Sequence, residues 1–144
     1  MAAALMRKRI ADWGLADQVE VQSAGVWARD GDPASNGAAT VLGQRGIALQ
    51  DHRSQAMTSQ LLAAASIVLV MEEDHRRSLF YLEPKHLRKV FLLTEMVGRS
   101  EGIADPYGGP LAGYEETADE LDRLIKDGLP AILRRIGVTR PQQA

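Results

Sequence analysis

The residues best suited to do chemistry stand together in the segment Asp105-Pro106-Tyr107-Gly108-Gly109. The proline favours an extended backbone at Asp105, and the two glycines let the chain turn back at once. Such a loop presents one carboxyl group at a fixed angle, as a general acid requires. The simpler alternative is an aspartate that caps a turn or a helix, because Asp is common in both places. The chain contains no cysteine, so it supplies neither a thiolate nucleophile nor a disulfide.

Three further side chains are candidates for a site near this loop. Ser23 could donate a hydrogen bond to a neighbouring anion-binding loop, and Trp27, just beyond Gly25, could form the wall of a pocket. His52, between Asp51 and an arginine, could orient a polar loop. Each has a plainer alternative, namely a strand-end hydroxyl with its hydrogen bonds satisfied, an aromatic ring covering a sheet edge and an exposed polar turn.

The remaining polar groups give no sign of a metal or cofactor. The histidines lack the close, regular spacing of a zinc site, and no glycine-rich phosphate loop of the P-loop or dinucleotide type is present. Glu72, Glu73 and Asp74 fall at a predicted helix start, where carboxylates favour the helix dipole. We therefore expect no metal site and no cofactor.

Hydrophobic patterning predicts an alternation of helices and strands. Helices are predicted at about 1–13, 34–45, 58–65, 74–82 and 111–136, and strands at 19–24, 67–71 and 90–93. The last two strands are unbroken apolar runs, which is typical of strands buried on both faces. The pattern indicates a three-layer α/β domain with a parallel sheet covered by helices. Pro130 should kink the last helix or split it in two.

Length and composition limit the other possibilities. The chain of 144 residues fits one domain, expected over 1–138, with a flexible polar tail at 139–144. A net charge of −2 argues against a nucleic-acid or membrane-surface partner. No apolar run approaches the ~20 residues that a membrane-spanning helix needs. We expect a cytoplasmic protein.

In order and spacing, five segments of the chain resemble those of one enzyme family. The segments are 1–5, 21–27, 51–54, 68–71 and 105–109. Together they resemble the low-molecular-weight protein tyrosine phosphatases, a family that also includes bacterial protein-arginine phosphatases and arsenate reductases. The glycine pair Gly108-Gly109 is more similar to the arginine-phosphatase branch.

The resemblance implies a fold and a role for each candidate. It implies a flavodoxin-like sheet whose first, central strand is missing here, together with the cysteine-containing phosphate loop and its arginine. Asp105 would act as general acid and base, Ser23 and His52 would support the phosphate loop, and Trp27 and Tyr107 would line the substrate cleft. The substrate would be a phosphorylated protein, on tyrosine or arginine, or a small phosphomonoester. Arsenate reduction needs cysteines and is excluded.

The missing segment leaves two interpretations open. Either the natural protein has a strand and a cysteine loop before Met1 and is an enzyme, or the chain as given is a non-catalytic binding or regulatory relative. In the second case it could repair its sheet by strand exchange, as a homodimer through the exposed gap. In both cases the polypeptide as given is expected to be inactive as a phosphatase.

Overall fold

Two short parallel strands form the sheet of the computed structural model, which describes residues 1–140. Strand β1 (Val68–Val70) pairs with β2 (Val90–Leu92), with Val68 opposite Val90. Both strands are wholly apolar, as burial on both faces requires. Positions 141–144 of the predicted tail lie outside the described residues.

The helices agree with the sequence pattern to within two residues at each end. They are α1 (Ala2–Asp12), α2 (Asn36–Gln44), α3 (Ser59–Ala64), α4 (Glu73–Leu82) and α5 (Leu111–Ile136), with the 3-10 helices η1 (Pro84–Lys89) and η2 (Leu93–Val97). The hydroxyls of Ser35 and Thr58 cap α2 and α3 by accepting hydrogen bonds from backbone N–H groups. Helix η2 is not among the helices predicted from the sequence.

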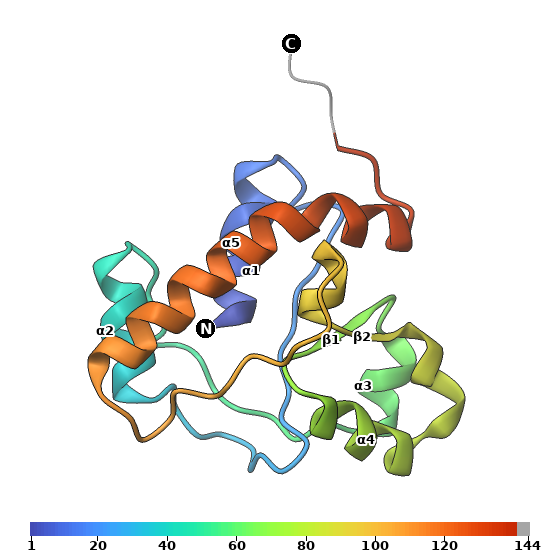
Figure 1. The fold of residues 1–144 in the computed structure, drawn as a ribbon, viewed down its shortest axis with the longest axis horizontal. Coiled ribbons are helices and arrows are strands. Elements are labelled where there is room, and N and C mark those ends of the chain that lie inside the picture. The colour runs from blue at the N-terminus through green and yellow to red at the C-terminus, as the bar shows by residue number, and fades with distance from the viewer. Residues whose placement is uncertain (141–144) are drawn as a thin grey trace.

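The sheet separates two hydrophobic clusters, which confirms the three-layer α/β architecture. On one face, Leu69 and Phe91 pack against a large cluster built mainly from α1, α2, α5 and η2. On the other face, Val70 and Leu92 belong to a smaller cluster with Leu79 of α4 and a leucine of α3. Figure 1 shows α5 crossing α1 and α2 on one side of the strands, with α3 and α4 on the other side. The parallel sheet therefore has helices on both faces.

The strand predicted at 19–24 is wrong. Val19 and Val21 are partly buried and alternate with exposed Glu20 and Gln22, as in a strand, but this stretch has no ladder partner among the described residues. The Arg7 guanidinium donates instead to the Val21 carbonyl oxygen, at 2.8 Å from Nη2. Alternation alone does not make a strand, because the backbone needs a neighbour to pair with.

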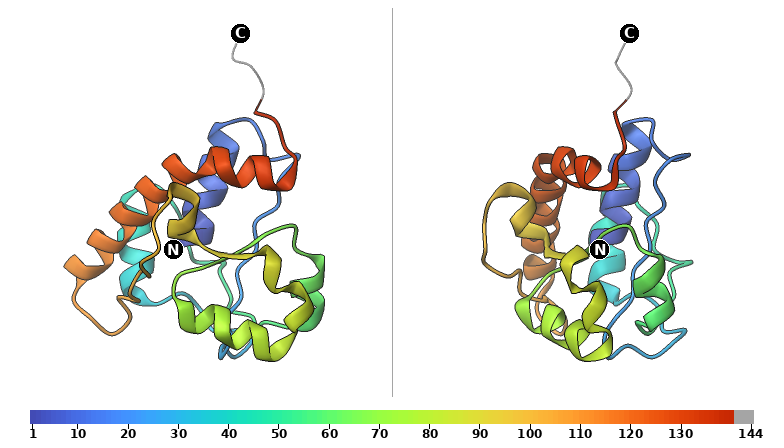
Figure 2. Two further views of the ribbon diagram at one scale, coloured as in Figure 1. Left: turned by 45° about the vertical axis from the view of Figure 1, so that its right-hand side comes forward. Right: turned by 90° about the vertical axis from the view of Figure 1, so that its right-hand side faces the viewer.

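Pro130 does not split the last helix. Helix α5 runs without a break from Leu111 to Ile136 and ends at Gly137, whose φ is 75°. Figure 2 shows its C-terminal part turned away from the direction of its first part. The predicted alternative of two separate helices is therefore wrong. No helix within residues 1–140 is long and apolar enough to cross a membrane.

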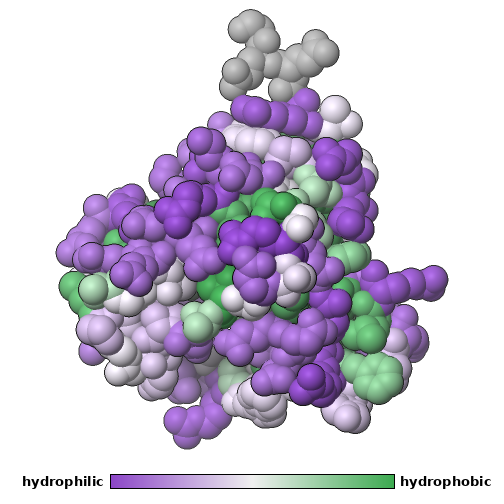
Figure 3. Space-filling view, in the orientation of Figure 1, coloured by the Kyte–Doolittle hydropathy of each residue, from purple (hydrophilic) through white to green (hydrophobic). Residues whose placement is uncertain are grey.

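The surface is largely hydrophilic, with a few exposed hydrophobic side chains. The clearest case is the end of α4, where Phe80 is 45% exposed and Leu82 is 40% exposed. Figure 3 shows hydrophobic side chains reaching the surface over this end of the molecule.

Candidate active site

The loop that carries Asp105 is hydrogen-bonded to the chain at the carboxyl end of β1. The Ile103 N–H donates to the carbonyl oxygen of Met71, one residue beyond the strand, at 2.8 Å. The Ile103 side chain is only 4% exposed and belongs to the larger hydrophobic cluster. A second anchor is the buried hydroxyl of Thr94, which donates to the Glu101 carbonyl oxygen at 2.8 Å. Asp105 is thus held beyond the carboxyl ends of the strands, where ligands bind in open parallel sheets.

Asp105 itself forms a turn and remains exposed. One carboxylate oxygen, Oδ1, accepts the Tyr107 N–H at 2.9 Å, and the Gly109 N–H donates to the Pro106 carbonyl oxygen at 2.9 Å. Gly108 has a φ of 79°, which glycine adopts without strain. Asp105 can therefore stabilise the turn and still present its carboxyl group, since the turn uses only one of the two carboxylate oxygens. The exposed group can exchange a proton with a bound molecule or with water.

The amino end of α1 lies in the same region as Asp105. Burial lowers the pKa of the Met1 ammonium group, and the Asp105 carboxylate opposes this shift by raising it. Burial also lowers the pKa of His52, and the positive charges of Met1, Arg7 and Arg53 lower it further. Helix α1 has no side-chain cap at its start, so its first N–H groups and its dipole favour a nearby anion. Met1, at a helix end that favours anions, thus lies within electrostatic reach of both Asp105 and His52.

Two aromatic side chains among the candidate residues are largely exposed. Tyr107 is 76% exposed and Trp27 is 78% exposed. The loop before Trp27 is fixed because Gly25 exchanges backbone hydrogen bonds with Gln55 and Met57 at 3.0 and 2.9 Å. Trp27 does not cover a sheet edge, which was its plainer interpretation. Both rings offer free faces to a ligand.

Ser23 is not joined to His52. Its backbone carbonyl oxygen accepts a hydrogen bond from the Gln55 side chain at 2.9 Å, and the residue is exposed. Within residues 1–140 the Ser23 hydroxyl forms no hydrogen bond. The structure therefore leaves Ser23 on an unpaired segment, whereas His52 lies within electrostatic reach of the Met1 ammonium group.

The hydrogen-bond network that shapes the 29–32 loop could not be predicted from the sequence. Ser54 N–H donates to the Asp32 carbonyl oxygen at 2.7 Å, and the Ser54 hydroxyl accepts the Asp32 N–H at 3.0 Å. The Ser54 carbonyl oxygen accepts the Gly31 N–H at 2.8 Å, and Asp30 Oδ1 accepts the Ala56 N–H at 2.8 Å. These partners are more than twenty positions apart, so no local pattern reveals them. The network fixes a loop beside the candidate site.

The side chains present at this site suit proton transfer and anion binding. Within residues 1–140 no three His, Asp or Glu side chains are grouped closely enough to hold a metal ion. Asp105 can donate or accept a proton, and the amino end of α1 can stabilise negative charge. A phosphoryl group carries such charge, and its transfer needs a general acid when the leaving group is poor.

Comparison with known proteins agrees with these features. The family model described as "Low molecular weight phosphotyrosine protein phosphatase" matches residues 1–136. The protein-arginine-phosphatase of Geobacillus stearothermophilus is 38% identical over 126 residues, which are 87% of this chain and 81% of that protein. The fold is likewise shared with solved structures.

Two of these structures are informative. A low molecular weight protein tyrosine phosphatase from T. tengcongensis has a TM-score of 0.85 at 37% identity, covering 90% of this chain and 88% of that one. A cysteine-to-serine mutant of the YwlE arginine phosphatase, with a phosphorylated active site serine, has a TM-score of 0.84 at 35% identity. That match covers 92% of this chain and 86% of the other. From the family model, the sequence identity and the common fold, we conclude that the chain belongs to the low molecular weight phosphotyrosine protein phosphatase family.

Proposed function

We propose that this chain provides the acid loop (residues 105–109) and the substrate-facing walls of a protein phosphatase site. Asp105 is the general acid and base, Tyr107 and Trp27 line the cleft, and His52 supports the phosphate-binding end of α1. Ser23 would join this support once its segment has a partner strand. The observation that carries the proposal is the anchored Asp105 loop at the carboxyl end of β1, beside the uncapped start of α1.

The proposed chemistry has two steps that need Asp105. In the first, a nucleophile attacks phosphorus while the protonated carboxyl group gives its proton to the departing oxygen or nitrogen. In the second, the carboxylate takes a proton from a water molecule that hydrolyses the phosphorylated intermediate. The YwlE mutant carries its phosphoryl group on a serine that replaces a cysteine, which supports a cysteine as the family's nucleophile. This chain has no cysteine, so we expect the polypeptide alone to leave phosphomonoesters intact.

The substrate class follows from the relatives and from the acid loop. Proteins similar to this chain are named both as arginine and as tyrosine phosphatases. The double glycine Gly108-Gly109 removes bulk beside Tyr107 and supports the arginine branch. We therefore propose a phosphorylated protein as the substrate, with phosphoarginine ahead of phosphotyrosine.

A binding or strand-exchanged form is the second candidate, and the sheet supports it. Within the described residues β1 pairs with β2 alone, so its other edge has no partner. Leu69 of β1 and Val21 of the unpaired 19–24 segment are only partly buried. An extended segment from a second copy would pair this edge. Light scattering tests this form, because a stable monomer at all concentrations would rule out the homodimer.

The enzymatic proposal is tested by adding a nucleophile to this chain. The segment of the Geobacillus stearothermophilus relative that precedes the matched part is joined in front of Met1. The chimera is expected to release p-nitrophenol from p-nitrophenyl phosphate, whereas the unmodified chain is expected to release none. Circular dichroism and thermal unfolding establish that each protein is folded. Asp105-dependent turnover by the unmodified chain, or a folded but inactive chimera, would contradict the proposal.

A further inference from the structure

A groove lies between the acid loop and the loop before α2. Its sides are residues 32–37 and 107–109, with Leu111 and Tyr114 from the start of α5. The groove holds about 740 Å³, within the range of natural ligand sites. Since Tyr107 is two residues from Asp105, the groove leads away from the candidate active site.

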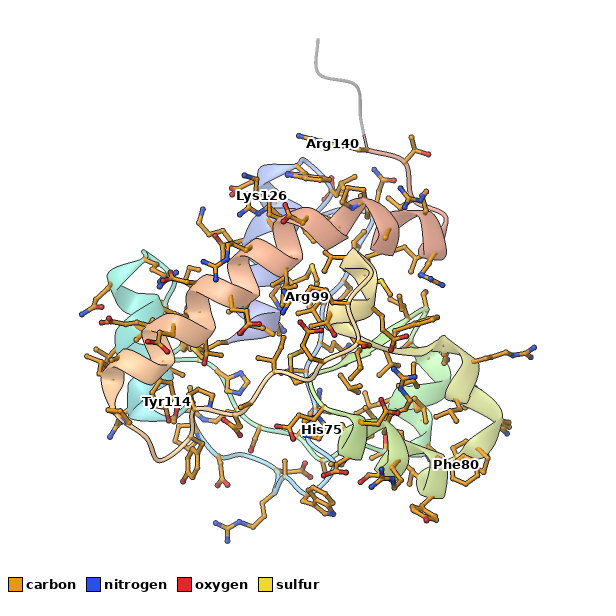
Figure 4. All side chains as sticks on the ribbon, viewed as in Figure 1. His75, Phe80, Arg99, Tyr114, Lys126 and Arg140 are labelled. Atoms are coloured by element: carbon orange, nitrogen blue, oxygen red, sulfur yellow. The ribbon has the colours of Figure 1, made fainter. Side chains whose placement is uncertain are left out.

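The floor of the groove is closely packed. A Cβ atom built on Gly37 would lie 2.4 Å from the ring of Tyr114, so α2 rests directly on this ring. Tyr114 is only 6% exposed, and Figure 4 shows it near the start of α5, beside α2. The sides are fixed as well, because Ser54 binds the backbone of Asp32 and the Asp105 turn holds Gly109. A bound segment would thus meet a surface that is already formed.

The charge of the groove comes from one residue, Asp32. It is the only ionisable acid or base among the groove's lining residues apart from the two tyrosines. Its side chain is 54% exposed, and its nearest cation is Arg29, whose Nε lies 3.8 Å away and whose side chain is 87% exposed. An ion pair this long and this exposed is weak, so Asp32 can readily pair with another cation instead. Leu111, 42% exposed, and the Tyr107 ring add an apolar surface that suits the methylene stem of a long side chain.

We infer that this groove binds the polypeptide that flanks the phosphorylated residue and selects a lysine or arginine there through Asp32. The inference rests on the proposed function, which puts the phosphorylated residue at Asp105. A basic side chain would lay its stem along Leu111 and Tyr107 and place its charge at the Asp32 carboxylate. An acidic residue at the same place would meet that carboxylate and be disfavoured.

The inference is tested by peptide binding, without any turnover. The ¹⁵N-labelled full chain is titrated with a phosphotyrosine peptide that carries two lysines after the phosphotyrosine, and with the same peptide carrying two glutamates. We expect NMR shifts of the Gly108, Gly109 and Asn36 amides and roughly two- to fivefold tighter binding of the lysine peptide, as for an exposed charge pair. Salt at about 0.5 M should reduce this preference.

Matched variants make the test specific. Asp32→Asn is expected to abolish the preference, Arg29→Gln to increase it, and Asp17→Asn, the same charge change elsewhere on the surface, to leave it intact. Equal binding of the two peptides, shifts confined to other residues, or an unchanged preference in Asp32→Asn would overturn the inference. Because p-nitrophenyl phosphate has no flanking residues, an active chimera combined with a failed titration refutes the groove alone. A successful titration combined with an inactive chimera refutes the proposed function alone.

Discussion

Replacing Ile103 by alanine should increase the mobility of the acid loop more than the loss of the protein's overall stability alone explains. Ile103 is buried two residues before Asp105, and its N–H is bonded to Met71. The substitution removes three carbon atoms from the larger hydrophobic cluster. At about 0.8 kcal/mol for each buried methylene, plus a term for the cavity that remains, the free energy of unfolding should fall by about 3 kcal/mol.

Ile132→Ala is the matched control. Ile132 is also 4% exposed and lies in the same cluster, but it belongs to the C-terminal part of α5. Urea unfolding should show a similar loss for both variants. Backbone ¹⁵N relaxation should separate them, because the order parameters of Asp105 and Tyr107 should fall toward about 0.6 only in Ile103→Ala. The reasoning is refuted if Ile103→Ala costs less than about 1 kcal/mol, or if both variants loosen the loop equally.

Two further predictions concern the groove and the pH dependence of stability. Gly37→Ala should destabilise the protein by about 1–3 kcal/mol, because the added methyl group must displace the Tyr114 ring. Gly43→Ala in the same helix, which meets nothing within 4 Å, should be neutral or stabilising by up to about 1 kcal/mol in urea unfolding. Folding lowers the pKa of His52 below its ordinary value of 6.5, so between these two pKa values the unfolded chain binds more protons than the folded one. The stability that is present above pH 6.5 is therefore lost as the pH falls toward the folded pKa. His52→Gln should therefore flatten the fall in unfolding free energy from about pH 7.5 to about pH 5.5, and an unchanged slope would contradict this.

The features that could be predicted from sequence are those set by neighbouring residues. Apolar periodicity predicts the extent of the helices to within two residues at each end. The Asp105 loop could be predicted because its proline and glycines act within five positions. The unbroken apolar runs likewise identified β1 and β2 as buried strands.

The features that could not be predicted depend on partners far away in the sequence, or lie in segments that are unpaired or too short to give a pattern. The 19–24 segment has the alternation of a strand, but strand formation needs a second backbone, which alternation does not report. Helix η2 is too short for a periodic signal. The groove depends on contacts between Gly37 and Tyr114 and between Asp32 and Ser54, each joining segments far apart in the sequence. The sequence therefore indicates candidate residues for a site, whereas it does not indicate the shape of the groove.

The central claim is that Asp105 protonates the leaving group, and its most direct test is the dependence of Asp105→Asn on the leaving group. In the chimera, kcat/KM is measured for phenyl phosphate, whose phenolate is a poor leaving group, and for p-nitrophenyl phosphate, whose nitrophenolate needs little protonation. Loss of general acid catalysis should lower the rate on phenyl phosphate by at least about 10²-fold and the rate on p-nitrophenyl phosphate by much less. Equal losses on the two substrates would show that Asp105 supports the site without acting as its acid.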